Sequence, residues 1–176
     1  MTPRTYQAEH WLSFLRLSDE ALLKHTRMDV FKATGKGGQK KNKTSNAIRL
    51  TLKHLSVTES GSRSRAENTS KALWKLRLAI ALDHREEKWP ESQPEKVPAE
   101  IEPYLNRSEI RINAKNPVYP VFIGWFFQRF LHRRGNWHAI AADLGITPSQ
   151  ARKFVEKHTD LKRALAEASS RLDQDA

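Results

Sequence analysis

One stretch decides the fold of this chain: Ile48-Arg49-Leu50-Thr51-Leu52-Lys53-His54-Leu55-Ser56-Val57-Thr58. Apolar and polar residues alternate in both halves of this stretch, which is typical of strands that bury one face. The alternation breaks at Lys53-His54, so we expect the chain to turn back there. The sequence therefore predicts a β-hairpin.

Helix and strand signals flank this hairpin on both sides. Before it, Ser18 can cap a short helix, and residues 27–32 alternate as a further strand. After it, Ser64-Arg65-Ala66-Glu67 has the spacing of a capping box and starts a helix that we expect to continue to Arg85. These elements predict an α+β fold, in which a small mixed β-sheet packs on a long helix and one loop protrudes.

The protruding loop is rich in glycine and lysine and reads Gly35-Lys36-Gly37-Gly38-Gln39-Lys40-Lys41-Asn42-Lys43-Thr44. Glycines let main-chain N–H groups approach a reacting centre closely, and lysines favour a phosphate-rich partner. The spacings of Walker and dinucleotide-binding loops are absent. Composition alone allows two interpretations: a solvated basic loop without chemistry, or a loop that delivers Gln39 to an electrophile.

In the second interpretation, the contribution of Gln39 is electrostatic. An amide is a poor acid or base, so Gln39 would orient water and offer its backbone N–H to a developing oxyanion, a contact worth about 3 to 4 kcal/mol when well aimed. A loop this polar needs a partner to order it. The sequence contains no cysteine, no Gly-x-Ser-x-Gly and no His-Glu-x-x-His, so no other catalytic set competes. We expect no metal site and no cofactor.

The charge of the chain is concentrated in its first half. The 176 residues carry a net charge of +11, and residues 1–85 hold 17 Lys+Arg against 7 Asp+Glu, whereas residues 86–176 hold 14 against 13. This excess favours an anionic partner. The longest apolar run, Val121 to Phe127, is far too short to span a bilayer, and no leader peptide is recognisable. We expect a cytoplasmic protein without a membrane partner, and the absence of cysteine fits a reducing compartment.

The second half is predicted to be a separate helical module. Prolines interleaved with glutamates indicate an extended linker over residues 88–107, between a first domain at 1–87 and a module at 108–176. The aromatic residues of the segment 119–131 have helical spacing and are expected to be core. A helix, a Gly-containing turn and a second helix follow at about 137–158, which is the helix-turn-helix pattern.

The loop and the residues that follow it resemble a known family. The pattern Gly35-x-Gly37-Gly38-Gln39-x-x-Asn42-Lys43-Thr44 is followed by Ala47-Ile48-Arg49-Leu50-Thr51, Arg63-Ser64, Asn68 and Lys71-Ala72. In this order and spacing, over about residues 22–82, the chain resembles the catalytic domain of peptide chain release factors and of the short, codon-independent ribosome-rescue proteins.

The resemblance implies hydrolysis of the peptidyl-tRNA ester in the peptidyl transferase centre, with the ribosome, its large-subunit RNA and peptidyl-tRNA as partners of a monomeric protein. By position, the catalytic residues are Gly37, Gly38 and Gln39. The residues that shape the loop are Gly35, Asn42, Lys43 and Thr44. The residues implied to bind RNA are Lys36, Lys40, Lys41, Lys43, Arg49, Arg63, Arg65 and Lys71.

Two departures from the family leave an alternative open. Lys36 stands where the family has a small residue or proline, and Lys41 where valine or arginine is common. No stop-codon-reading domain is recognisable, so we expect codon-independent rescue, whereas the lack of a long basic tail, like Lys36, leaves the alternative open. The alternative is a non-catalytic ribosome- or RNA-binding factor that keeps the fold. A DNA-binding regulator built on the helix-turn-helix is a third hypothesis, which the near-neutral second half disfavours.

Overall fold

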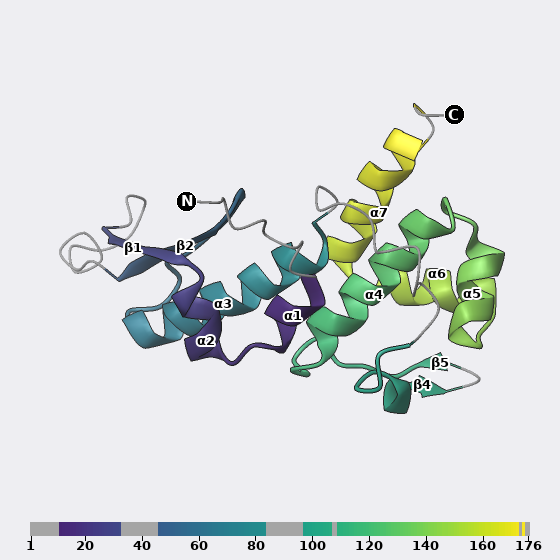
Figure 1. Ribbon diagram of the computed structural model, residues 1–176, viewed down its shortest axis with the longest axis horizontal. Helices are drawn as coiled ribbons and strands as arrows, with labels where there is room; N and C mark the ends of the chain where they lie inside the picture. The colour runs from purple at the N-terminus through teal and green to yellow at the C-terminus, as the bar shows by residue number, and fades with distance from the viewer. Residues whose placement is uncertain (1–10, 33–45, 84–96, 107–108, 173, 175–176) are drawn as a thin grey trace, which may run out of the picture. The chain divides into compact units, whose positions relative to one another are not determined.

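The computed structural model describes residues 11–32, 46–83, 97–106, 109–172 and 174 (Figure 1). The chain divides into two compact units. We call Ser13–Ile80 the sheet unit, and Ala81–Ala176 together with Met1–Leu12 the helical unit. Of the described helices, none is long and apolar enough to cross a membrane.

The sheet unit is built on a three-stranded antiparallel sheet in the order β1-β2-β3. The strands are β1 (Arg27–Phe31), β2 (Ala47–Leu52) and β3 (Leu55–Glu59). Lys53 adopts a left-handed conformation with φ 52° at the turn, which confirms the hairpin expected there. Leu50 pairs with Met28 on one side and Val57 on the other, so these three apolar residues share one face, whereas Phe31 and Ala47, which pair with one another, lie on the opposite face.

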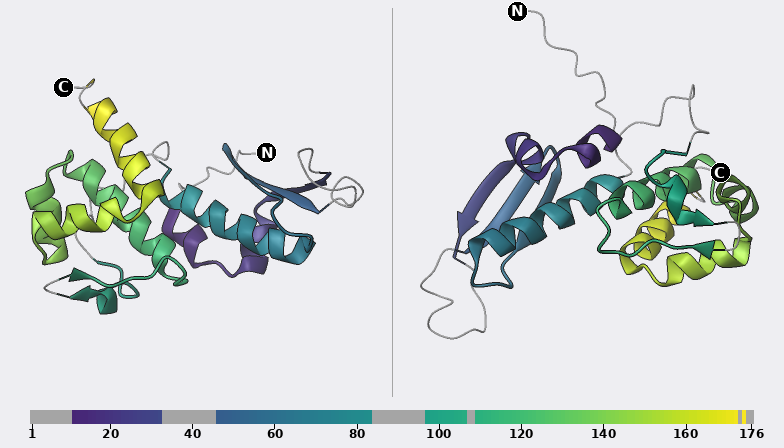
Figure 2. Two further views of the ribbon diagram at one scale, coloured as in Figure 1. Left: turned by 180° about the vertical axis from the view of Figure 1, so that it is seen from behind. Right: turned by 90° about the horizontal axis from the view of Figure 1, so that it is seen from below.

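Helix α3 (Arg65–Ala81) lies along the sheet (Figures 1 and 2). Its apolar stripe is buried, as is the apolar face of β2; the core side chains on the two elements are Ala72, Leu73, Leu76, Ile80, Ala47, Ile48, Leu50 and Leu52. The expectation that α3 continues to Arg85 is wrong, because the helix ends at Ala81. An acidic side chain at position 83 would be unfavourable in a last turn, where the helix dipole is negative.

Two short helices precede the sheet. The first, α1 (Trp11–Arg16), was not predicted, and α2 (Asp19–Lys24) begins after Ser18, whose hydroxyl accepts the Ala21 N–H as expected. Arg77 of α3 fastens the connection between them. Its guanidinium donates to the carbonyl oxygens of Leu15 and Leu17 at 3.1 and 2.8 Å and to Asp19 at 2.8 Å.

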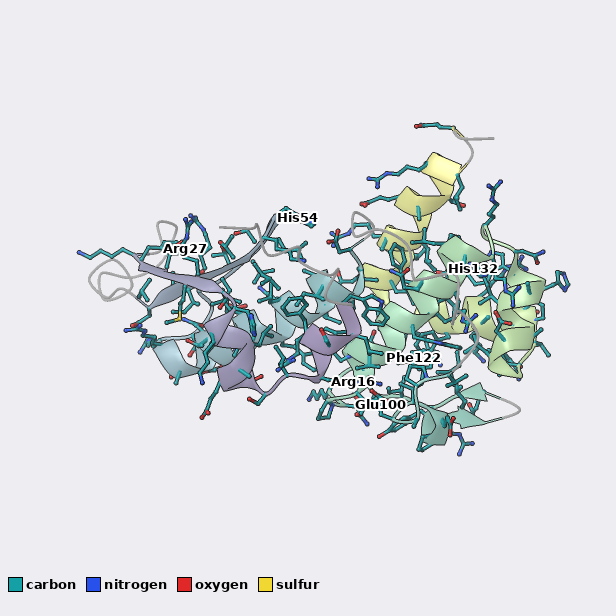
Figure 3. The ribbon with its side chains drawn as sticks, viewed as in Figure 1. Arg16, Arg27, His54, Glu100, Phe122 and His132 are labelled. Carbon is teal, nitrogen blue, oxygen red and sulfur yellow. The ribbon has the colours of Figure 1, made fainter. Side chains whose placement is uncertain are left out.

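The helical unit is built around one helix rich in aromatic residues, α4 (Tyr119–His132). This helix packs against α5 (Trp137–Leu144) and α7 (Thr159–Leu172) (Figure 1). The aromatic residues of α4 are buried, which confirms that they form core. Phe122, labelled in Figure 3, is fully buried and meets the ring of Phe154 edge-on at 5.2 Å. Phe154 lies on α6 (Pro148–Glu156).

The helix-turn-helix is formed by α5 and α6, as predicted. Asn136 caps α5 and Gly145 ends it in the left-handed conformation, with φ 66°. Thr147 and Gln150 then form a reciprocal capping box at the start of α6. Each side chain satisfies a backbone N–H that the helix leaves unpaired.

The expected linker, residues 88–107, lies partly outside the described residues. Its described end contains a 3-10 helix, η1 (Glu102–Tyr104), and the strand β4 (Leu105–Asn106), which pairs with β5 (Glu109–Ile110). Pro98 and Ile101 are buried there. Ile101 supplies an apolar anchor within a segment whose prolines and glutamates indicate an extended chain.

Candidate functional site

The residues predicted to form the loop lie outside the described residues: Gly35, Lys36, Gly37, Gly38, Gln39, Lys40, Lys41, Asn42, Lys43 and Thr44. The structure describes the strands on both sides of them. Phe31, at the end of β1, pairs with Ala47, at the start of β2. The two points where residues 33–45 leave and rejoin the sheet are therefore adjacent, at one end of the sheet unit (Figure 1).

Arg49 lies at this end of the sheet and is exposed. Its guanidinium carbon is 5.1 Å from the centroid of the Phe31 ring, a cation–π arrangement. Arg49 pairs with Asp29, and Phe31 follows Asp29 by two residues on β1, so the side chains of Arg49 and Phe31 are diagonal neighbours on one face of the sheet. The contact fixes a permanent positive charge beside the last residue of β1. On the same strand, Arg27, labelled in Figure 3, forms an ion pair with Asp29.

A buried asparagine connects the start of β2 to the segment before α3. Asn68 is completely buried, and its amide nitrogen donates to the carbonyl oxygens of Asn46 at 2.7 Å and Ser62 at 2.9 Å. Its amide oxygen accepts the Ser62 N–H at 2.9 Å. Asn46 in turn donates to the Arg63 carbonyl oxygen at 2.7 Å. We call this set of four hydrogen bonds the asparagine clamp; it fixes the residue at which the chain rejoins the sheet.

The N-terminus of α3 is capped differently from the predicted capping box. Ser64 does accept the Glu67 N–H, at 3.3 Å. The Glu67 carboxylate, however, accepts from the hydroxyl of Ser62, and that hydroxyl accepts the Ser64 N–H at 3.0 Å. In a standard capping box the Glu67 carboxylate would accept the Ser64 N–H directly. Here the Ser62 hydroxyl lies between the two groups and connects them.

Three of the predicted RNA-binding cations lie on this capped end: Arg63, Arg65 and Lys71, all exposed. Lys71 donates to Glu67 at 2.6 Å, and this hydrogen bond raises the pKa of Lys71 and lowers that of Glu67. No ion pair with a described residue is found for Arg63 or Arg65. The clamp therefore brings unneutralised cations on the α3 side close to the point where β2 begins.

A second ion pair holds α3 to β3. Lys75 contacts the carboxylate of Glu59 at 2.7 Å, and Glu59 also accepts the Gly61 and Ser60 N–H groups. The hydrogen bond from Lys75, followed by that from Gly61, lowers the pKa of Glu59 against the opposing effect of its burial. The lowered pKa makes Glu59 a weak base, and its contacts with Lys75, Ser60 and Gly61 give it a structural role.

The sequence motif does not predict the asparagine clamp. Asn68 belongs to the motif pattern, but Asn46 and Ser62 do not stand out in the sequence. One signal was present: Asn68 lies four and eight residues before Ala72 and Leu76, and thus begins the buried stripe of α3 with a polar residue. Over the described residues, no cluster of His, Asp and Glu is arranged to hold a metal ion.

Comparison with known families identifies the part of the chain that contains the sheet. A family model described as the RF-1 domain matches residues 20–119, more than half of the chain. The match contains β1 to β3, the intervening Gly-Gly-Gln segment, α3, η1, β4 and β5, and leaves residues 1–19 and 120–176 uncovered. No curated protein and no solved structure matches the chain. The protein thus belongs to the RF-1 domain family, the Gly-Gly-Gln-containing catalytic domain of class I release factors, which implies a release-factor-like, peptidyl-tRNA-hydrolysing function on the ribosome.

Proposed function

We propose that this protein releases nascent peptides from stalled ribosomes by hydrolysing peptidyl-tRNA without reading a stop codon. The observation that carries the proposal is the pairing of Phe31 with Ala47, which sets both ends of the Gly-Gly-Gln segment side by side on a three-stranded sheet. The sheet and the asparagine clamp provide a fixed base from which this segment can be presented to a partner.

In the proposed reaction, water attacks the ester carbonyl that joins the peptide to the 3′ end of tRNA. The products are a peptide with a free carboxyl group and a tRNA with a free 3′ hydroxyl, so one water molecule is consumed per ester. The backbone N–H of Gln39 stabilises the developing oxyanion, and Gly37 and Gly38 allow the close approach. Ribosomal RNA and the tRNA complete the site, which is why the protein needs no cofactor of its own.

The proposal assigns RNA contacts to the cations around the loop. Arg49, Arg63 and Arg65 are exposed at the loop base and on the α3 side of the clamp. The lysines within the segment at positions 36, 40, 41 and 43 add positive charge. Because phosphate contacts dominate nucleic-acid affinity, these groups would draw the protein to large-subunit RNA. We further propose that it acts in the cytoplasm as a monomer.

Codon independence is supported by what accompanies the catalytic domain. The residues that follow the family match form nearly all of α4 and then α5, α6 and α7, and α5 and α6 make a helix-turn-helix. In the proposal, these helices act with the catalytic domain without contacting a stop codon.

The test is release of labelled peptide from purified ribosomes that carry peptidyl-tRNA and an empty, a sense-codon or a stop-codon A site. We expect release without a stop codon, and we expect Gln39→Ala to abolish it while ribosome binding persists. Gln174→Ala, a glutamine substitution near the other end of the chain, is the matched control and should release normally. Ribosome binding without release by the wild-type protein would refute the proposal and favour the non-catalytic factor.

A further inference from the structure

The exposed side of α6 carries positive charge that the catalytic domain does not explain. Ala151, Phe154 and Val155 are buried in the helical unit. Arg152 and Lys153 are exposed on the other side of the helix, and Lys157, the residue that ends it, lies one turn after Lys153. We call Arg152, Lys153 and Lys157 the α6 cation face. It lies outside the region that matches the RF-1 domain.

The nearby carboxylates are engaged elsewhere. Glu156, the acidic residue on the exposed side of α6, pairs with Lys162 at 2.6 Å. Asp160 pairs with Arg163 at 3.3 Å, and Asp143 with Arg133 at 2.8 Å. Among the described residues, no ion pair is found for the three members of the α6 cation face. Their charge is therefore available to an external anion.

The α6 cation face is also held in place. The Arg152 guanidinium carbon lies 5.3 Å from the centroid of the Trp137 ring, at the first residue of α5. Trp137 packs in turn against Phe130 of α4, with the ring centroids 5.7 Å apart. The capping box of Thr147 and Gln150 fixes the start of α6. A partner would thus meet a preorganised surface, which lowers the entropic cost of binding.

The position of the charges along α6 favours contacts with phosphates over base reading. A helix-turn-helix that reads bases uses the N-terminal residues of its second helix. Here that turn offers Pro148, which has no side-chain donor, and Gln150, whose amide oxygen accepts the Thr147 N–H at 2.7 Å. Ser149 alone is exposed in this turn. The cations lie farther along the helix, where they can follow a phosphate backbone without reading sequence.

We propose that the α6 cation face binds the phosphate backbone of helical ribosomal RNA, as a second RNA contact separate from the catalytic domain. The choice of RNA rests on the proposed function, because the ribosome is the partner that the family implies. Helical RNA is recognised mainly through its shape and phosphates. The proposal gives the helical unit a role in holding the protein on the ribosome.

The test measures binding of the full chain to a short RNA duplex, to a DNA duplex of the same sequence, and to purified ribosomes. Lys153→Gln with Lys157→Gln removes two cations from the α6 cation face. Lys115→Gln with Arg171→Gln is the matched control, because it removes two exposed cations of the same unit for which no ion pair with a described residue is found. Lys153→Arg with Lys157→Arg keeps the charge and should bind like the wild type.

We expect the Lys153→Gln/Lys157→Gln variant to bind the RNA duplex and the ribosome about tenfold more weakly, with a salt dependence reduced by about two phosphate contacts. The control should bind normally. If the wild-type protein binds the ribosome but releases no peptide, the proposed function is refuted. The comparison of RNA binding between the variants still tests the α6 cation face in that case.

Three results would overturn the inference. Equal losses in the test and control variants would show that net charge alone matters. Tighter binding to the DNA duplex than to the RNA duplex would make DNA the ligand. A loss of ribosome binding without loss of RNA-duplex binding would identify a ribosomal protein as the partner.

Discussion

Removing the Asn68 side chain should loosen the sheet unit at the point where the catalytic segment rejoins it. Asn68→Ala deletes three hydrogen bonds, two to carbonyl oxygens and one from the Ser62 N–H, at a completely buried position. At about 1 kcal/mol net for each bond, and more for a group that stays buried without a partner, the loss should be about 2 to 4 kcal/mol. Total stabilities of domains are about 5 to 15 kcal/mol, so this is a large fraction.

Hydrogen–deuterium exchange of the β2 and α3 amides measures this loss in the sheet unit alone. A loss of 2 to 4 kcal/mol corresponds to about 30- to 1000-fold faster exchange through unfolding. Asn46→Ala removes one bond of the clamp, the one to the Arg63 carbonyl, and should cost about 1 kcal/mol. If Asn68→Ala exchanges no faster than Asn46→Ala, the clamp does not carry the stability assigned to it.

Asn68→Asp provides an independent check of the geometry. It keeps an oxygen that can accept the Ser62 N–H but sets a second oxygen against two carbonyl oxygens. This arrangement favours the protonated carboxyl group in the folded state and so raises its pKa above the unfolded value of about 3.9. The folded state then binds more protons, so Asn68→Asp should lose stability as the pH rises above that value. Asn68→Ala should show no such dependence.

Two further predictions concern the helical unit. Gly124→Ala would place a methyl group 2.4 Å from the buried Trp11 ring. Although alanine has the better helix propensity, we expect the free energy of unfolding, measured by urea titration, to fall by about 1 to 3 kcal/mol. An unchanged urea midpoint would contradict this packing. Burial, and then the charge of Lys157, lowers the pKa of His158 from 6.5, so the unfolded state binds the proton more readily and stability should fall as the pH drops below 6.5. His158→Gln should flatten that dependence in the same titration, whereas an equally steep dependence would assign it to another group.

Elements with a local signal could be predicted from the sequence. The hairpin turns at Lys53-His54 because the alternation of apolar residues stops there, and the reversal needs no distant residue. The capping box at Thr147 and Gln150 follows from residues three positions apart. Both depend on short-range geometry, and both form as expected.

Contacts between distant segments could not be predicted in this way. Asn46 and Asn68 are 22 positions apart, and no periodic pattern connects a residue after a polar loop with one near a helix N-terminus. Ile101 is an isolated apolar residue among prolines and glutamates, and its complete burial depends on the fold around it. The sequence does not mark the end of α3 at Ala81, because its helical pattern extends to Arg85 and only one acidic residue, at position 83, argues against the last turn. The Gly-Gly-Gln segment could be recognised by its motif, but it lies outside the described residues.

The contacts of Arg77 also constrain the order in which the sheet unit can fold during its own synthesis. Arg77 holds the Leu17 carbonyl across 60 positions of the chain. At about 5 to 20 residues per second, Arg77 is added roughly 3 to 12 s after Leu17. The connection between α1 and α2 therefore leaves the ribosome well before the side chain that fastens it. During synthesis on the ribosome, the connection between α1 and α2 therefore cannot form these contacts until α3 has been made. The ribosome is also the particle on which a release-factor-like protein acts.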